Sequence, residues 1–214
     1  MIINIFFIIK EVGVLMKKKV WDRFAPLYDL AMKSDRDTYD DMYSKISDSV
    51  GGKSVLEIAS GTGRLARSVA PASKRFVATD YSEGMLSVAS KEACPDNLSF
   101  ELADANNLPY PDDSYEVVII ANALHIMPDP TKALSEIRRV LKPGGLLIAP
   151  NFVNRAGGVK SNLWTRFLSL IGVNFEHRWT EDEYAKFIED NGWKIQYRGI
   201  IDTRIPIVYL ECRP

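Results

Sequence analysis

Short apolar runs alternate with helical patterns along most of the chain, and this alternation constrains the fold more than any other feature. The run Tyr115–Ala121 (YEVVIIA) is the strongest of them and is continuously apolar, as a strand buried on both faces must be. We therefore expect a doubly wound parallel sheet covered by helices, which is an α/β fold. The expected strands span residues 54–59, 75–79, 99–102, 115–121, 146–149, 194–199 and 205–212.

Cap residues place the helices between these strands. Ser82 predicts a helix start, and Asp129 does the same with a proline directly after it. Thr180 with Glu183 forms a capping-box pattern before a helix that ends near Asn191. The sequence Lys-Pro-Gly-Gly at 142–145 predicts the end of the helix that Asp129 begins.

Composition narrows the possible functions. The 214 residues are 46% hydrophobic and 26% charged, which suits one globular domain. Lysine and arginine number 27 against 28 acidic residues, so the chain lacks the basic excess expected of a nucleic-acid-binding protein. Two cysteines and two histidines, in no metal-binding spacing, predict a reduced, cytoplasmic protein without a metal site.

The first residues follow a different pattern. The apolar start MIINIFFII is about half as long as a membrane-spanning helix, so we expect no stable membrane insertion. Lys10–Val12 can be encoded by a ribosome-binding sequence, and Met16 follows at the distance of a start codon. The expected segments are a mistranslated leader or disordered tail at 1–15, an N-terminal helical cap at 16–50 and the main domain at 51–214.

A glycine-rich turn follows the first expected strand. Gly61, Gly63 and Ala66 satisfy the GxGxxG/A pattern of dinucleotide-binding loops, and Asp80 comes about 20 residues later, at the end of the second strand. Asp104 follows the third strand in the same way. Taken by itself, the glycine-rich turn could simply be a bend that requires glycine. Taken by itself, each acidic residue could be a helix cap or part of a solvated turn. Together, at successive strand ends, they favour a nucleotide-like cofactor at the carboxyl edge of the sheet.

This set of motifs resembles the class I S-adenosylmethionine (SAM)-dependent methyltransferases, and most closely the branch that includes the ubiquinone/menaquinone methyltransferases. The matching blocks, in order, are WDRFAPLYD, VLEIASGTG, FVATDYSEGML, ADANNLPYPDDSYEVVI, NALHIMPDP and RRVLKPGGLLIAP. Ala59 departs from the family pattern, which has its first glycine there. The resemblance implies a Rossmann-like sheet of seven strands, the last one antiparallel, behind an N-terminal helical cap.

The resemblance also implies SAM as the cofactor and a role for each matching residue. Glu57, Ala59, Gly61 and Gly63 would line its methionine half, and Asp80 would bind the ribose. Tyr81 and Met85 would flank the adenine, Asp104 and Ala105 would read its edge, Ala121 and Asn122 would face the methyl-bearing end, and Tyr28 would close over the cofactor.

The chemistry left to the protein is to align an acceptor, exclude water and, for a hydroxyl or carbon acid, supply a base. His125, just past the central strand, is the candidate base, and a histidine packed beside the substrate is the alternative. The insertion at 154–179 would form a substrate lid. Its aromatic residues would suit an apolar or aromatic acceptor, or would simply pack the lid onto the sheet.

We therefore expect SAM-dependent methyl transfer to a small-molecule acceptor. Two other functions use part of the same pattern, a nicotinamide-dependent oxidoreductase and a non-catalytic SAM-binding regulator. The oxidoreductase leaves the Asp104–Ala105 and LKPGG blocks unexplained. Nothing in the sequence predicts the oligomeric state.

Overall fold

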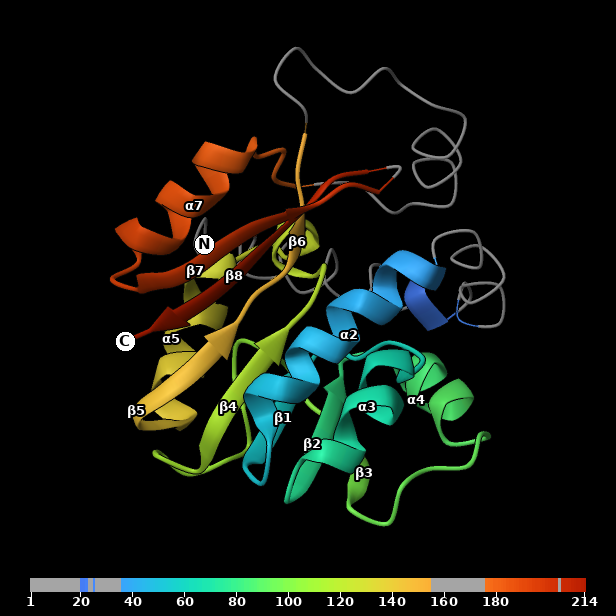
Figure 1. Ribbon diagram of the computed structural model, residues 1–214. Coiled ribbons are helices and arrows are strands. Elements are labelled where there is room, and N and C mark those ends of the chain that lie inside the picture. Colours follow the sequence, from blue (N-terminus) through green and yellow to red (C-terminus); the bar gives the residue numbers. More distant parts are fainter. Residues whose placement is uncertain (1–19, 23–24, 26–35, 155–175, 204) are drawn as a thin grey trace, which may run out of the picture.

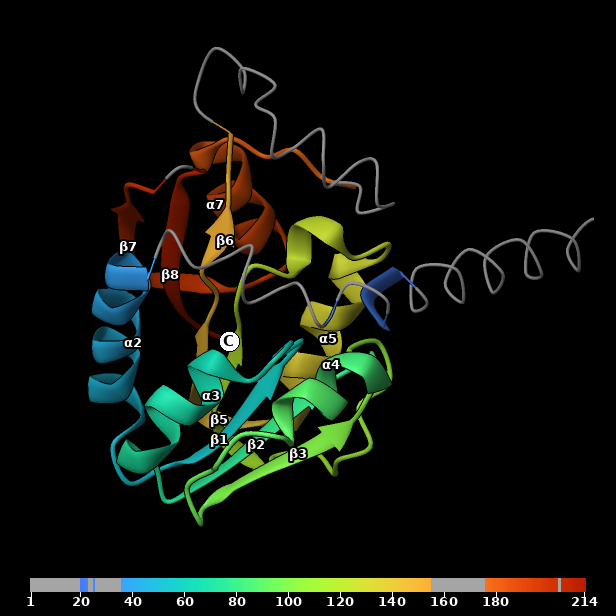
Figure 2. The ribbon, with the colours of Figure 1, turned by 90° about the vertical axis from the view of Figure 1, so that its right-hand side faces the viewer.

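The computed structural model describes residues 20–22, 25, 36–154, 176–203 and 205–214, which form one sheet with helices on both faces (Figures 1 and 2). The strands are β1 (Ser54–Ile58), β2 (Arg75–Asp80), β3 (Leu98–Leu102), β4 (Tyr115–Ile120), β5 (Leu141–Ile148), β6 (Asn151–Phe152), β7 (Lys194–Ile201) and β8 (Ile207–Arg213). The helices are α2 (Arg36–Val50), α3 (Arg64–Val69), α4 (Glu83–Ala89), α5 (Pro130–Val140) and α7 (Glu181–Asp190), with 3-10 turns η2 (Ala70–Ala72) and η3 (Leu124–Ile126). The predicted leader, Tyr28 and most of the predicted lid lie outside the described residues.

The sheet confirms the doubly wound α/β prediction. Its strand order is β3-β2-β1-β4-β5-β8-β6, with β7 paired to β8. β1 to β5 run parallel, and β8 is antiparallel to β5, β6 and β7, as expected for the last strand. The chain reverses its direction of winding between β1 and β4, which is where ligands bind in such sheets.

The sheet has eight strands rather than the predicted seven. The additional strand, β6, consists of two residues that follow β5 directly. Asn151 pairs with Val208 and Phe152 with Ile207, so the long strand β8 continues pairing beyond the end of β5. The pattern of two residues is too short to be recognised in a sequence.

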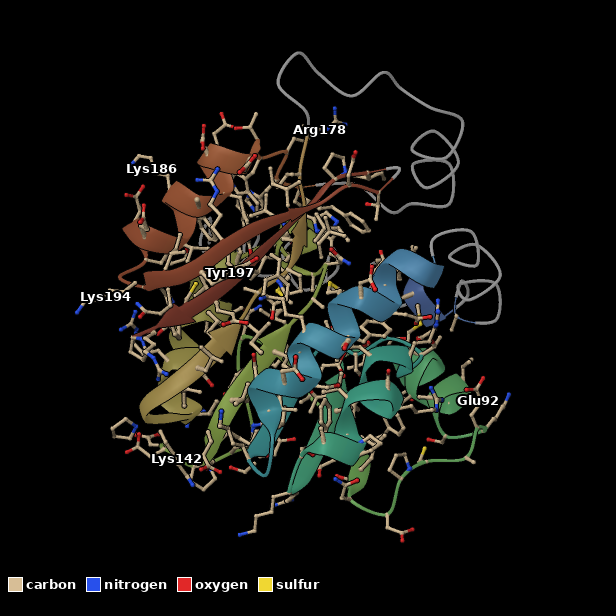
Figure 3. The ribbon with its side chains drawn as sticks, in the orientation of Figure 1. Glu92, Lys142, Arg178, Lys186, Lys194 and Tyr197 are labelled. Atoms are coloured by element: carbon tan, nitrogen blue, oxygen red, sulfur yellow. The ribbon has the colours of Figure 1, made fainter. Side chains whose placement is uncertain are left out.

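Two separate cores explain why the central strand is apolar on both faces. Val117 and Ile119 of β4 pack into the core shared with α2 and α3. Val118 and Ile120 pack into the core shared with α5 and α7. In Figure 1, α2 and α3 lie in front of the sheet and α5 lies behind it. Charged side chains such as Lys186 point outward instead (Figure 3).

The predicted helix caps are all present. Ser82 accepts a hydrogen bond from the Met85 N–H at 3.1 Å, and Asp129 caps α5 in the same way. Thr180 and Glu183 form the reciprocal capping box at the start of α7. Each of these bonds spans three residues, which is why the sequence alone could locate them.

The start of β5 differs from the prediction. Helix α5 ends at Val140, although the sequence pattern extends it to Leu141, and the strand begins at once, at Leu141, instead of at Leu146. Leu141 pairs with Tyr115, and the register then shifts so that Leu146 pairs with Val117. The Lys-Pro-Gly-Gly sequence is therefore a bulge inside a strand rather than a connection in front of it.

Among the described residues, no helix has the length and apolar character needed to cross a membrane.

Candidate functional site

The loop after β1 bends through left-handed backbone conformations. Gly61 has φ +56° and Gly63 has φ +76°, which glycine adopts without steric cost. Ala59 has φ +57°, where a side chain costs roughly 1–2 kcal/mol. This backbone angle explains why the family pattern has a glycine at the position that Ala59 occupies.

Asp80 ties this loop to the end of β2. Its Oδ2 accepts a hydrogen bond from the Gly61 N–H, and its Oδ1 accepts one from the Ser82 N–H, both at 2.8 Å. Burial raises the pKa of Asp80, and these backbone hydrogen bonds oppose that rise. Each carboxylate oxygen can accept a second hydrogen bond, so Asp80 keeps the capacity to bind a hydroxyl.

A cleft of about 220 Å³ opens at the carboxyl edge of the parallel strands. It brings together nine of the residues predicted to bind the cofactor: Ala59, Gly61, Asp80, Tyr81, Met85, Asp104, Ala105, Ala121 and Asn122. Trp21, from the N-terminal segment, lines the same cleft.

Several lining residues were missed from the sequence. They are Trp21, Ile58, Ser82, Ala103, Asn106, Ala123 and the segment Ile126–Pro128. All of them lie inside the motifs that carry the family resemblance, so the motifs were the available signal. Which side chain of a motif faces the cleft depends on how the loop turns, and the sequence does not show this.

Glu57 lies in a smaller adjoining cavity of about 70 Å³, which shares Ala59, Gly61, Ala121 and Asn122 with the cleft. Tyr39 and Arg64 also line it. Glu57 is only 2% exposed, and its Oε2 has no hydrogen-bond partner among the described residues. Burial, and secondarily the charge of Asp80, raise the pKa of Glu57 well above its usual value.

Gly63 lines neither cavity. A side chain at this position would bring a Cβ within 2.4 Å of the Phe100 Cζ, in addition to the strain of its positive φ. Gly63 therefore allows the start of α3 to pack against β3. The described contacts place it behind the site rather than in it.

His125 also lines neither cavity. It is 3% exposed, and its ring meets Phe152 edge-on, with 5.5 Å between the ring centroids. Its Nδ1 lies 3.0 Å from Oδ1 of Asn151, whose amide nitrogen donates to the Phe152 carbonyl. Because this bond orients the amide, Nδ1 carries the proton and donates to Asn151. Burial lowers the pKa of His125 to about 4, so the ring is neutral at neutral pH.

Comparison with known proteins points to one family. Residues 56–149 match the family model described as "Methyltransferase domain". The chain is 41% identical over 104 residues to a demethylmenaquinone methyltransferase from Clavibacter sepedonicus, covering 48% of this chain and 42% of the relative. It is 33% identical over 177 residues to a demethylmenaquinone methyltransferase from Renibacterium salmoninarum, covering 72% of this chain and 74% of the relative. The chain thus spans less than half of the first relative and about three quarters of the second.

The fold is also that of solved methyltransferase structures. Magnesium protoporphyrin IX methyltransferase from Synechocystis, solved with bound S-adenosylhomocysteine (SAH), superposes with a TM-score of 0.65 at 20% identity. The match covers 84% of this chain and 85% of that one.

The polar atoms at the site fit SAM. The four buried ones without a hydrogen-bond partner among the described residues are Glu57 Oε2, Ser60 Oγ, Asn106 Oδ1 and Asn122 Oδ1. All four can accept hydrogen bonds, and a buried acceptor without a donor is costly. SAM carries a cationic amino group, a cationic sulfonium and an adenine amino group. The ligand therefore supplies donors for acceptors that have none among the described residues.

Proposed function

Since the chain belongs to the class I SAM-dependent methyltransferase family, we propose that it transfers the methyl group of SAM to a small, flat, apolar acceptor of quinol type. The two relatives described above are named for methylation of demethylmenaquinone, and this name supports the acceptor class. The single observation that carries the proposal is Glu57, a buried carboxyl that adjoins the cleft and whose Oε2 has no donor among the described residues.

In this proposal, different residues of the two cavities bind different parts of the cofactor. Glu57 and Asn122, which meet in the smaller cavity, would hold the amino end. Asp80 would bind the ribose, and the turn with Asp104 and Asn106 would bind the adenine. When bound, SAM supplies a methyl group already activated by its sulfonium, so these residues need only orient it and keep water out.

The apolar wall of the cleft supports a flat acceptor. Ile126 and Met127 follow β4 at the point where Ala121 and Asn122 would face the methyl group. Apolar surfaces of this kind favour a ring over a charged acceptor.

The role of His125 as the general base stays a prediction. Its neutral ring can accept a proton, but the described geometry holds it against Asn151 and outside both cavities, which favours the alternative of a packing residue. If His125 is the base, His125→Ala lowers turnover by about 100-fold at unchanged SAM affinity. If it packs, the variant loses about 1–3 kcal/mol of stability, because Asn151 Oδ1 is left without its donor, and the folded fraction keeps its turnover.

The decisive experiment measures cofactor binding and turnover separately. Titration calorimetry is expected to show binding of SAM and SAH but not of NAD. A panel of quinols, phenols, thiols and amines then identifies the acceptor by formation of SAH. Absence of SAM binding would refute the family function for this chain, whereas SAH formation with thiols or amines alone would refute only the quinol-type acceptor.

A further inference from the structure

The loop between β3 and β4 carries one wall of the cleft. Its residues Asp104 and Asn106 are held in one tight turn, in which Oδ1 of Asp104 accepts the Asn106 N–H at 2.8 Å. The Asn107 N–H closes the same turn on the Asp104 carbonyl at 3.0 Å. Asp104 and Asn106 therefore move as a unit, and something outside the turn must set its position.

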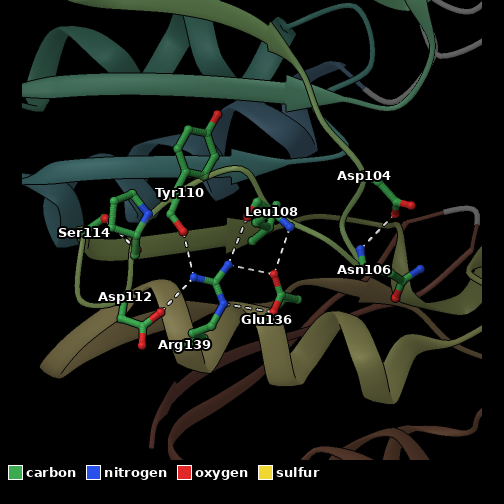
Figure 4. Close-up of polar contacts among 9 residues, drawn as sticks. Asp104, Asn106, Leu108, Tyr110, Asp112, Ser114, Glu136 and Arg139 are labelled. Carbon is green, nitrogen blue, oxygen red and sulfur yellow. Dashed lines mark hydrogen bonds and ion pairs between the residues drawn. The ribbon is translucent and has the colours of Figure 1, made fainter.

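Arg139, on α5, uses every N–H of its guanidinium group, and three of these five donors hold the loop (Figure 4). Its Nη1 donates to the Tyr110 carbonyl at 2.7 Å and to the Asp112 carboxylate at 2.9 Å. Its Nη2 donates to the Leu108 carbonyl at 3.0 Å. The remaining two N–H groups bond Glu136, at 3.0 Å from Nε and 2.8 Å from Nη2. An arginine has five N–H donors, and all five are used here.

Glu136 completes the attachment. Its Oε2 accepts the Leu108 N–H at 2.9 Å, so the two side chains of α5 bind both backbone polar groups of Leu108 (Figure 4). The hydrogen bond from Arg139 lowers the pKa of Glu136, which keeps the carboxylate charged. The pair is partly shielded from water, with side chains 31% and 18% exposed. Charged hydrogen bonds of this geometry are stronger than exposed ion pairs.

The other end of the turn is fixed independently. The Ala103 N–H donates at 3.1 Å to the carbonyl of Asp80, the residue whose side chain accepts the Gly61 N–H of the loop after β1. The segment that contains Asp104 and Asn106 is thus tied to β2 on one side and to α5 on the other. The Leu108 anchor lies only two residues beyond Asn106, so a shift of that anchor must reach the acceptors in the cleft.

We propose that Glu136 and Arg139 are positioning residues that fix Asp104 and Asn106 for recognition of the 6-amino group of the cofactor's purine. Neither side chain lines the cleft, so the pair acts through the loop. The inference rests on the proposed function, because it takes the ligand to be SAM or its product. Arg139 lies in the sequence block RRVLKPGGLLIAP and Glu136 lies two residues before it, and the family resemblance assigned no role to either residue.

The test compares SAH with S-inosylhomocysteine, in which an oxygen replaces the 6-amino group. The wild type is expected to bind SAH about tenfold or more tightly, the effect of one hydrogen bond to a charged group. In Arg139→Ala the two affinities are expected to converge, mainly because SAH binds more weakly. A purely structural role would weaken both ligands equally and leave their ratio unchanged, and that result would overturn the proposal.

Arg138→Ala is the matched control. This neighbouring arginine lies on the same helix but faces the other way, with its guanidinium 4.6 Å from the Trp193 ring centroid and Nη2 bonded to the Asn191 carbonyl at 3.2 Å. Its variant is expected to keep the wild-type preference for SAH. Loss of the preference in Arg138→Ala as well would show that the effect is not specific to the loop anchor, and would also overturn the proposal.

Arg139→Lys keeps the experiment decisive if the alanine variant does not fold. Lysine retains the charge beside Glu136 but cannot reach the Leu108 and Tyr110 carbonyls with a rigid fork. A reduced preference for SAH is therefore expected, and a full preference would overturn the proposal. A wild type that binds SAH and S-inosylhomocysteine equally would also overturn it, while SAM turnover by that protein would leave the proposed function standing.

Discussion

Replacing Glu57 with glutamine tests whether the buried carboxylate binds the cationic amino group of SAM. Glu57 is 2% exposed, and its Oε2 has no hydrogen-bond partner among the described residues. Burial and the neighbouring Asp80 raise its pKa well above 4.5. Glutamine has nearly the same shape without the charge, so the substitution isolates the electrostatic contribution.

The sign of the pH dependence follows from that raised pKa. A group whose pKa is raised on folding stabilises the protein below its unfolded pKa, and that contribution is lost as the pH rises through the folded value. We therefore expect the free protein to lose stability with rising pH through this window, relative to Glu57→Gln. A bound cation lowers the pKa of Glu57, so wild-type SAM affinity rises with pH there, by at most about tenfold per unit for one proton.

The magnitude comes from the lost charged hydrogen bond. Removing the charge is expected to cost roughly 1.5–3 kcal/mol of binding free energy, or about 10- to 100-fold in SAM affinity, at pH values above the raised pKa of Glu57. Calorimetry in two buffers of different ionisation enthalpy detects the proton that the wild type releases on binding SAM. The variant should release none at this position.

Glu116→Gln is the control for this experiment. Glu116 lies on β4, where its Oε2 accepts the Ser54 N–H at 2.9 Å, and this bond lowers its pKa. Its contribution to stability is therefore present above the unfolded pKa and lost as the pH falls, the opposite sign to Glu57. Identical pH profiles for the wild type and Glu57→Gln, with unchanged SAM affinity, would refute the reasoning.

Three further substitutions probe the site. Ala59→Gly, at φ +57°, is expected to raise the free energy of unfolding by up to about 1 kcal/mol by chemical denaturation, and a loss of stability would contradict the strain argument. Gly84→Ala would place a Cβ 2.6 Å from the Asp22 Cα, so the N-terminal segment should shift and move Trp21, which lines the cleft. SAM affinity should then fall by about 2- to 10-fold, the effect of weakening the contact with this one aromatic ring. Gly51→Ala, with nothing within 4 Å, is its control and should bind SAM normally in the same titration. Asp80→Ala is expected to weaken SAM binding by about 10- to 100-fold, and unchanged affinity would remove Asp80 from the site.

The parts of the fold that depend on local rules could be predicted from the sequence. The central strand follows from a continuous apolar run, and both of its faces are indeed buried. The start of α4 follows from Ser82, whose hydrogen bond reaches only three residues along the chain. The glycine turn and the acids after β2 and β3 could be placed at one edge because parallel strands end together.

Features that depend on tertiary pairing could not be predicted. The Lys-Pro-Gly-Gly sequence signals a turn, but Leu141 pairs with Tyr115 in front of it and makes it a bulge. Arg138 and Arg139 are equivalent as sequence, and only the packing of α5 turns one toward Trp193 and the other toward the cleft loop. His125 follows the central strand as predicted, but the 3-10 turn that contains it points the ring at Asn151.

Three departures from local rules meet where the two cavities join. Ala59 and Asn122 both adopt positive φ, at +57° and +51°, without being glycine. Glu57 lies beside them as a buried carboxyl whose Oε2 has no donor among the described residues. Each feature destabilises the free protein, and natural sequences keep such features mainly at functional sites. Because a cationic ligand would give Glu57 its missing partner, the binding energy of SAM offsets part of the cost of folding this edge. The destabilisation caused by these three residues should therefore be smaller in the SAM-bound protein than in the free protein.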